Sequence, residues 1–237
     1  MSIAFENYKK ITNQIEITCL ANGRNPDDVS ILAVSKTKSA EIVQEFLDEC
    51  KLAQTSVLLG ENYVQEWSEK CVQLKGNFRS HFIGHLQSNK AKLAVSLFDV
   101  IESVDSLKIA KAINQAAKNQ DKIQNIFLQV NVSNDPAKSG FPLEGVGLDL
   151  FKELSSLDNI SIIGLMTITQ YYENPSESLA DFMKLAELKE TLFALGMLPV
   201  EAATTFALSM GMTSDYEYAI QAGATEVRIG TAIFGER

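Results

Sequence analysis

Apolar residues in this chain gather in short unbroken runs rather than in alternation with polar ones. The runs occupy residues 30–36, 55–62, 79–84, 99–104, 125–132, 159–167, 205–210 and 226–231. Runs of this length are typical of strands that are buried on both faces, which is the pattern of a parallel sheet. We therefore expect eight parallel strands.

Segments with helical spacing separate these runs. Helices are expected at 4–22, from 39 to 52, 63–74, 86–97, from 105 or 106 past 117, and 143–157, with a long one ending near Gly196 and a short one opened by Thr213, Ser214 and Asp215. The Asn22-Gly23 pair is a good stop for the first helix. The proline and glycine residues of 133–142 exclude regular structure there.

The regular alternation of strands and helices predicts the fold class. Eight strand–helix steps without a linker rich in proline or serine favour an α/β fold, a single closed (β/α)8 barrel over residues 1–237. Because no closing helix fits after the last strand, we expect the extra N-terminal helix to cover that gap. An open doubly wound sheet is the alternative, but no G-x-G-x-x-G sequence follows a strand.

Composition narrows the classes of function. The net charge is −9, and no basic patch is evident, which argues against nucleic-acid binding. The three cysteines form no C-x-x-C pair, so we expect no disulfide framework and a reducing, cytoplasmic location. The polar N-terminus does not resemble a signal peptide, and no apolar run approaches the roughly 20 residues of a membrane span.

Residues just past the C-terminal ends of barrel strands usually form the site. These positions hold Ser35, Lys36, Glu61, Asn62, Gly84, His85, Ser103, Asp105, Asn131, Met166, Thr167, Ser209, Met210, Gly211, Arg228, Gly230 and Thr231. The set contains one reactive amine, one fixed cation and many hydrogen-bonding groups. It contains no acid pair at obvious spacing and no Ser-His-Asp arrangement.

The last two strand ends are rich in serine, glycine and threonine. Ser209-Met210-Gly211 and Gly230-Thr231 together look like the phosphate-binding cup that loops 7 and 8 form in such barrels. Lys36 ends the first strand, and a lysine facing that cup across the barrel mouth suggests a Schiff base with a phosphorylated aldehyde. Ordinary turns and an ordinary exposed lysine remain the alternative.

Other charged residues leave two interpretations open. An extended backbone would place Lys38 beside Lys36, and the charge of Lys38 would then lower the pKa of the Lys36 amine. Lys38 can equally be solvated. His81 and His85 lack a third ligand, so we expect no metal site and a satisfied core histidine at His81. Arg228 lies inside an apolar strand and needs a partner, so a structural salt bridge is a serious alternative to binding.

Eight segments carry a resemblance to a known family. They are AVSKTK (33–38), GENYVQE (60–66), HFIGHLQSNK (81–90), SVDS (103–106), KSG (138–140), GLMTI (164–168), LSMGM (208–212) and VRIGTAIFG (227–235). In order and over nearly the whole chain, they resemble the pyridoxal phosphate homeostasis protein family. The fold of that family is similar to the barrel domain of alanine racemase.

The resemblance implies a role for each matching residue. Lys36 would link covalently to pyridoxal 5′-phosphate (PLP), and Asn62 would lie near its ring. His85 and Met166 would line the pocket, and Ser209, Met210, Gly211, Gly230 and Thr231 would bind the phosphate. Arg228 would face the pyridine nitrogen, and because an arginine does not give up its proton, the ring would be a weak electron sink. The roles of Lys38 and Lys138 stay open.

The implied function is to bind, carry or buffer PLP in vitamin B6 homeostasis, as a cytoplasmic monomer that hands the cofactor to apo-enzymes. We expect no catalytic residue and no turnover, because the chain ends at Arg237 without the second domain that gives a racemase its opposite-face tyrosine. A PLP-dependent racemase or lyase is one alternative. A Schiff-base aldolase without cofactor is another.

Overall fold

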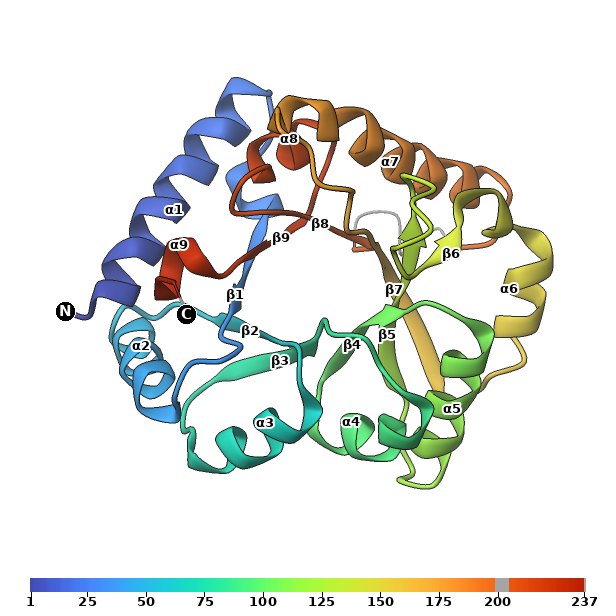
Figure 1. Ribbon diagram of the computed structural model, residues 1–237, viewed down its shortest axis with the longest axis horizontal. Coiled ribbons are helices and arrows are strands. Elements are labelled where there is room, and N and C mark those ends of the chain that lie inside the picture. The colour runs from blue at the N-terminus through green and yellow to red at the C-terminus, as the bar shows by residue number, and fades with distance from the viewer. Residues whose placement is uncertain (199–204, 237) are drawn as a thin grey trace.

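The computed structural model describes residues 1–198 and 205–236, and within them eight parallel strands close into a barrel (Figure 1). In ring order these are β1 (Ser30–Val34), β2 (Val57–Glu61), β3 (Phe78–Phe82), β4 (Val100–Val104), β5 (Gln124–Asn131), β7 (Ile160–Met166), β8 (Ala207–Met212) and β9 (Glu226–Ile229). Strand β1 pairs in parallel with both β2 and β9, and β4 pairs with β5. The predicted barrel is confirmed, and the open sheet is excluded.

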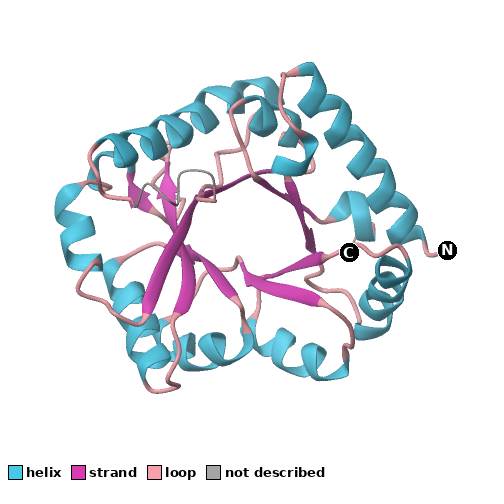
Figure 2. Ribbon diagram, turned by 180° about the vertical axis from the view of Figure 1, so that it is seen from behind, coloured by secondary structure: helices cyan, strands magenta, loops and turns pink. Residues whose placement is uncertain are grey.

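Helices surround the barrel on its outside (Figure 2). They are α1 (Ile3–Ala21), α2 (Ala40–Leu52), α3 (Val64–Lys70), α4 (Ala91–Leu97), α5 (Leu107–Lys118), α6 (Leu148–Leu154), α7 (Ser178–Ala194), α8 (Tyr216–Gln221) and α9 (Thr231–Phe234). Helix α5 is an example of why these segments form helices on the outside of the barrel. Ser106 caps it, and Ile109, Ile113 and Ala117 are buried on one face. None of the described helices is long and apolar enough to cross a bilayer.

Three helices are shorter than the sequence predicts. In the segment 143–157, α6 begins only at Leu148, because Gly145 and Gly147 disfavour an earlier start. In the segment 86–97, a 3₁₀ turn over Ser88–Lys90 precedes α4, since serine and asparagine favour turns. Helix α3 likewise ends at Lys70 and continues as a 3₁₀ turn, a common way for a helix to end.

The segment 133–142 is not wholly irregular, which corrects the prediction. Its last two residues form β6 (Phe141–Pro142), which pairs in parallel with the end of β5. Pro142 is tolerated because β6 lies at the outer edge of the pairing. Gly140 has φ +137°, and a Cβ there would lie 2.7 Å from the Asn131 nitrogen, so this approach requires glycine.

The end of the chain differs from the prediction that no helix fits after the last strand. The single-turn helix α9 follows β9 directly, and Gly235 with φ +77° ends it. Helix α1 packs against α8 and α9, where the Asn7 side-chain amide donates to the Ile233 carbonyl at 3.2 Å. The expectation that α1 helps to cover this gap is therefore confirmed. Arg237 lies outside the described residues.

Candidate functional site

The first and last strands of the barrel are neighbours, and this places Lys36 beside the cup predicted at the C-terminal strand ends. Ala33 of β1 pairs with Ile229 of β9. A Cβ on Gly230 would lie 3.4 Å from the Val34 side chain. The Lys36 loop therefore adjoins Gly230 rather than facing it across the barrel mouth. The reason is barrel closure, which makes the first and last strands adjacent.

The two predicted halves of the cup come together at the ends of β8 and β9. The hydroxyl oxygens of Thr213 and Thr231 lie 3.4 Å apart. Thr231 begins α9, and the first N–H groups of a helix point out of its N-terminal end. Gly211 has φ +89°, and a Cβ there would meet Ala219 Cβ at 2.5 Å, so a side chain is excluded.

One part of the predicted cup lies deeper than expected. Strand β8 continues to Met212, so Ser209 and Met210 are inside the strand and fully buried. The sequence predicts a strand end at residue 210, because serine and glycine are frequent in turns. The buried Ser209 hydroxyl instead bonds to charged side chains in the barrel interior, as described below.

The loop that carries Lys36 has an unusual backbone. Thr37 has φ +64°, a left-handed conformation that is uncommon for a residue other than glycine. The chain between Lys36 and Lys38 is therefore not extended, so the premise that an extended backbone pairs the two amines is wrong. The Lys38 amine instead donates to the Glu236 carbonyl at 2.6 Å, which links this loop to the segment after α9.

A buried lysine organises the same loop from the outside of the barrel. Lys70 of α3 is 5% exposed, and its amine donates to the Ser35 carbonyl at 2.9 Å and to Glu61 Oε1 and Glu66 Oε1 at 2.8 Å each. Glu66 Oε1 also accepts the Thr37 N–H at 2.7 Å. We call this set, Ser35, Thr37, Glu61, Glu66 and Lys70, the Lys70 clamp.

Glu61 is the deepest carboxylate of the clamp. It is fully buried, and its Oε1 also accepts the Ser35 hydroxyl at 2.7 Å. Burial raises the pKa of Glu61, while the bonds from Lys70 and Ser35 oppose that shift. The ammonium of Lys70 has three donors and three acceptors here, so its charge is matched by hydrogen bonds.

A second buried set lies inside the barrel, and we call it the barrel network: His81, Glu102, Ser209, Glu226 and Arg228. The Ser209 hydroxyl donates to Glu102 Oε2 at 2.6 Å and accepts from Arg228 Nη1 at 2.9 Å. His81 Nδ1 lies 2.6 Å from Glu102 Oε1 and 3.5 Å from Glu226 Oε2. Arg228 is thus linked to Glu102 through the Ser209 hydroxyl. This link is a structural role of the kind that the sequence left open for Arg228, but it is not a direct salt bridge.

Burial shifts the pKa values of the titratable groups in the barrel network. It raises the pKa of Glu102, and together with the negative charge of Glu102 it raises the pKa of Glu226 to about 8. Burial lowers the pKa of His81, which favours the neutral imidazole, and its Nδ1 shares a hydrogen bond of 2.6 Å with Glu102 Oε1. Among the described residues, His81 Nε2 has no hydrogen-bond partner. The prediction of a satisfied core histidine therefore holds for one ring nitrogen.

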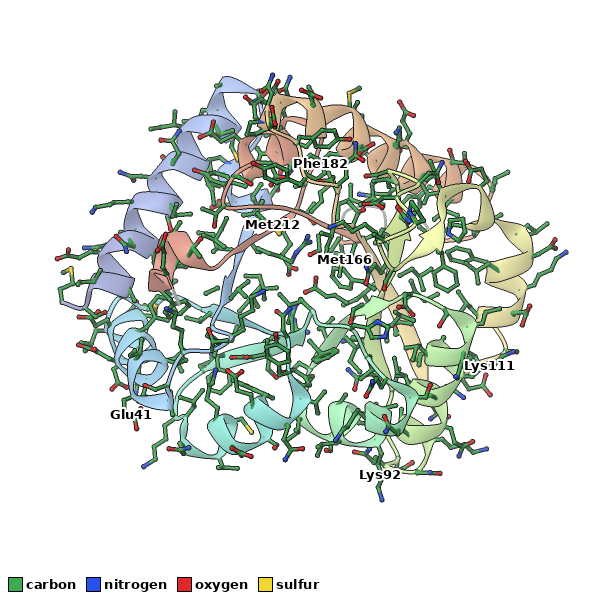
Figure 3. The ribbon with its side chains drawn as sticks, viewed as in Figure 1. Glu41, Lys92, Lys111, Met166, Phe182 and Met212 are labelled. Atoms are coloured by element: carbon green, nitrogen blue, oxygen red, sulfur yellow. The ribbon has the colours of Figure 1, made fainter. Side chains whose placement is uncertain are left out.

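The remaining predicted site residues differ in depth. Met166 at the end of β7 is fully buried inside the ring of strands (Figure 3). Asn62 follows β2, and its buried Oδ1 has no hydrogen-bond partner among the described residues. Gly84 packs on Asn62, since a Cβ there would lie 2.0 Å from the Asn62 carbonyl oxygen. The His85 side chain is 65% exposed and lies 3.3 Å from Asp105.

Sequence reasoning missed Lys70, Glu66, Glu102, Glu226 and Thr213 as parts of this region. Signals were present for most of them. Glu66 and Lys70 have the i,i+4 spacing of a helical ion pair. Glu102 and Glu226 are charges within otherwise apolar strand sequences, as Arg228 is. For Thr213, the only signal is its place directly after β8.

Comparisons with known proteins identify the family. The family model described as alanine racemase, N-terminal domain, matches residues 20–237. The pyridoxal phosphate homeostasis protein of Vibrio alginolyticus is 39% identical over 100% of this chain and 99% of its own length. That of Haemophilus influenzae is 40% identical over 98% of this chain and 94% of its own.

A solved structure supports the same assignment. PipY of Synechococcus elongatus with PLP bound is 32% identical, covers 99% of this chain and 100% of its own, and superposes with a TM-score of 0.78. Identity at this level over whole chains, together with the shared barrel, shows the family. This chain belongs to the pyridoxal phosphate homeostasis protein family.

Proposed function

We propose that this chain binds PLP covalently through Lys36 and carries or buffers it in vitamin B6 homeostasis. The observation that carries the proposal is the adjacency of the Lys36 loop to the Gly230–Thr231 end of β9, in a chain whose full-length relatives are named for PLP homeostasis. Bound PLP supplies an aldehyde that reacts with amines and a ring that can accept electrons.

The residues at this end of the barrel suit such a ligand. Two threonine hydroxyls, those of Thr213 and Thr231, and the start of α9 offer donors for a phosphate. The buried Oδ1 of Asn62 lacks a protein partner among the described residues, and such an atom calls for a ligand or water. Gly84 and Gly211 keep the surrounding backbone close, with no room for a side chain.

The remaining predicted residues complete the proposed site. Gly211 belongs to the proposed phosphate side, which Ser209 and Met210 support from inside strand β8, and His85 and Met166 belong to the rim and wall of the pocket. The buried Arg228 would face the ring nitrogen, and because an arginine does not give up its proton, the ring would be a weak electron sink. A weak sink favours holding the cofactor over turning amino acids over. We therefore propose a binding protein without turnover, rather than a racemase or lyase.

The covalent link is tested by replacing Lys36. The purified wild type with PLP should be yellow, and borohydride should fix the cofactor on a peptide that contains Lys36. Lys36→Ala should lose the visible band, while Lys38→Ala, which removes an amine two residues away, should keep it. A wild type that stays colourless with PLP would overturn the proposal and leave a cofactor-free aldolase as the alternative.

The phosphate side is tested separately, by comparing PLP with pyridoxal. Charge-assisted hydrogen bonds contribute about 1.5–3 kcal/mol each. Thr231→Val, which keeps shape and removes the hydroxyl, should weaken PLP binding at least about tenfold and leave the weak binding of pyridoxal unchanged. Thr12→Val, on the outer helix α1, is the matched control. Equal affinity of the wild type for the two vitamers would show that no phosphate is bound here.

The carrier role is tested by transfer and by turnover. The loaded protein should pass PLP to an apo-enzyme that depends on it, and it should neither racemise nor decarboxylate amino acids above the background of free PLP. We further propose that it acts as a cytoplasmic monomer and meets apo-enzymes only transiently. Amino-acid turnover that disappears in Lys36→Ala would instead favour the enzyme.

A further inference from the structure

We propose that the Lys70 clamp is a positioning device for Lys36 that sets how long the cofactor is retained. The inference rests on the proposed function, because it concerns the lysine that links to PLP. It assigns a task to Glu66 and Lys70, which lie on α3 outside the barrel and do not belong to the predicted site.

The clamp fixes both peptide groups that flank Lys36. The Ser35 carbonyl belongs to the peptide before Lys36, and Lys70 binds it at 2.9 Å. The Thr37 N–H belongs to the peptide after Lys36, and Glu66 binds it at 2.7 Å. Because the two peptide planes determine the backbone dihedral angles of the residue between them, the clamp fixes the direction in which the Lys36 side chain leaves the backbone.

The two anchors act as one unit. Glu66 Oε1 accepts from both the Thr37 N–H and the Lys70 amine, so the ammonium connects the carbonyl before Lys36 to the N–H after it. Glu61 fixes the ammonium from the barrel side and also bonds to the Ser35 hydroxyl. All these bonds involve a charged donor or acceptor, and such bonds are stronger and shorter than neutral ones.

A purely structural role for Lys70 accounts for only part of this arrangement. Glu61 is fully buried and needs a cation, which explains the Glu61–Lys70 pair. Glu66 is different, because its side chain is 28% exposed and could be solvated without a partner. Glu66 nevertheless holds Thr37, and Thr37 has the left-handed φ of +64°. The Glu66 contact with Thr37 therefore serves the loop, in addition to the acceptor that Glu66 gives the buried Lys70 amine.

The consequence for the cofactor follows from proximity. A lysine with a fixed backbone stays near an aldehyde held by its phosphate, so the bond between them re-forms quickly whenever it is hydrolysed. A loop that moves freely gives the aldehyde time to leave. The clamp should therefore slow the release of PLP more than it changes the fold.

Glu66→Ala is the variant that isolates this effect, because Lys70 keeps its bonds to Glu61 and Ser35. Glu66→Gln retains an oxygen that can accept from Thr37 and serves as the conservative rescue. Glu69→Ala makes the same change of charge at an exposed position of the same helix and is the matched control. Lys70 itself is left intact, since its removal would strand the buried Glu61.

Three measurements are made on each protein. Hydrogen exchange of the Thr37 amide in the PLP-free protein reports on the clamp without any cofactor. The dissociation rate of PLP, followed by loss of the visible band in the presence of excess trapping amine, reports on retention. Urea unfolding of the PLP-free protein reports on the fold. In Glu66→Ala we expect faster exchange at Thr37 and about three- to tenfold faster PLP loss, while Glu66→Gln and Glu69→Ala stay close to the wild type.

Each contrary outcome is distinct. A wild type that forms no visible band overturns the proposed function, and this inference with it. A wild type that binds PLP while Glu66→Ala releases it at the same rate overturns this inference alone. Unchanged exchange at Thr37 also overturns it, since the clamp would not hold the loop. Faster release that follows a matching loss of stability to urea would show a structural effect and reject positioning.

Discussion

The Lys70 clamp and the barrel network solve the burial of charge in opposite ways. In the clamp, one ammonium donates to three acceptors. The clamp also binds two backbone groups of a loop, the Ser35 carbonyl through Lys70 and the Thr37 N–H through Glu66. In the barrel network, side chains from β3, β4, β8 and β9 bond to one another across the barrel. There the two carboxylates Glu102 and Glu226 lie close together, and the pKa of Glu226 rises to about 8.

The two sites therefore differ in what they can control: the clamp fixes a backbone, and the barrel network sets a local charge. The clamp comes from one stretch of chain, residues 61–70, that acts on the loop 35–37 of the neighbouring strand, so it can fix a backbone. The barrel network brings His81 within 3.5 Å of Glu226, which lies 145 positions later in the chain, and it sets the charge near Arg228. The first holds an amine in place, and the second sets the electrostatic surroundings of a buried cation.

Removing Lys70 should give the largest effect and would show that the clamp is a paired ion site. Lys70→Met leaves Glu61 buried without its cation, which typically destabilises a fold by about 3–5 kcal/mol. Adding Glu61→Gln in the same chain should recover much of that loss, because the stranded charge is gone. Urea unfolding of the PLP-free protein measures both. A double variant no more stable than Lys70→Met would show that packing, rather than charge, accounts for the loss.

A matched pair of serines compares the two networks directly. Ser209→Ala leaves both Glu102 Oε2 and Arg228 Nη1 without the hydroxyl that joins them, so we expect a loss of about 2–3 kcal/mol. Ser35→Ala removes one of the two donors to Glu61 Oε1, and Lys70 remains, so a loss of about 1 kcal/mol is expected. Both serines are fully buried, which makes the comparison fair. Equal losses in urea unfolding would contradict the distinction drawn here.

The fold could be predicted from the sequence because unbroken apolar runs indicate strands that are buried on both faces of a sheet. All eight barrel strands were predicted, and errors were concentrated where local and tertiary forces compete. The two-residue β6 pairs, among the described residues, with the end of β5, and a propensity argument does not detect this long-range pairing. Helix α9 was missed because a single turn has no helical period, and it is stabilised by contact with α1.

The sequence predicts site residues only where they lie at the ends of predicted strands. The positions of Lys36, Gly230 and Thr231 follow from that rule, but their adjacency follows from barrel closure. The left-handed Thr37 left no signal in the sequence, since threonine rarely adopts that conformation. Lys70 was missed because a lysine on an outer helix is normally solvated, and only the three-dimensional contact with β1 and β2 buries it.

The last expected effect is a change of slope with pH, and it tests the barrel network alone. The pKa of Glu226 rises from the usual 4.5 to about 8 in the folded protein, so the folded state holds a proton that the unfolded state loses. The stability from this group is fully present below about 4.5 and is lost as the pH rises towards about 8. The slope cannot exceed about 1.4 kcal/mol per pH unit for one proton.

Glu226→Gln keeps a neutral side chain throughout, so its stability relative to the wild type should rise over this window and level off above it. Urea unfolding of both proteins between pH 5 and pH 9, at roughly one-unit steps, measures the difference. Parallel curves would mean that Glu226 is ionised in the fold, and that Arg228 balances both carboxylates as fully as Lys70 balances its own.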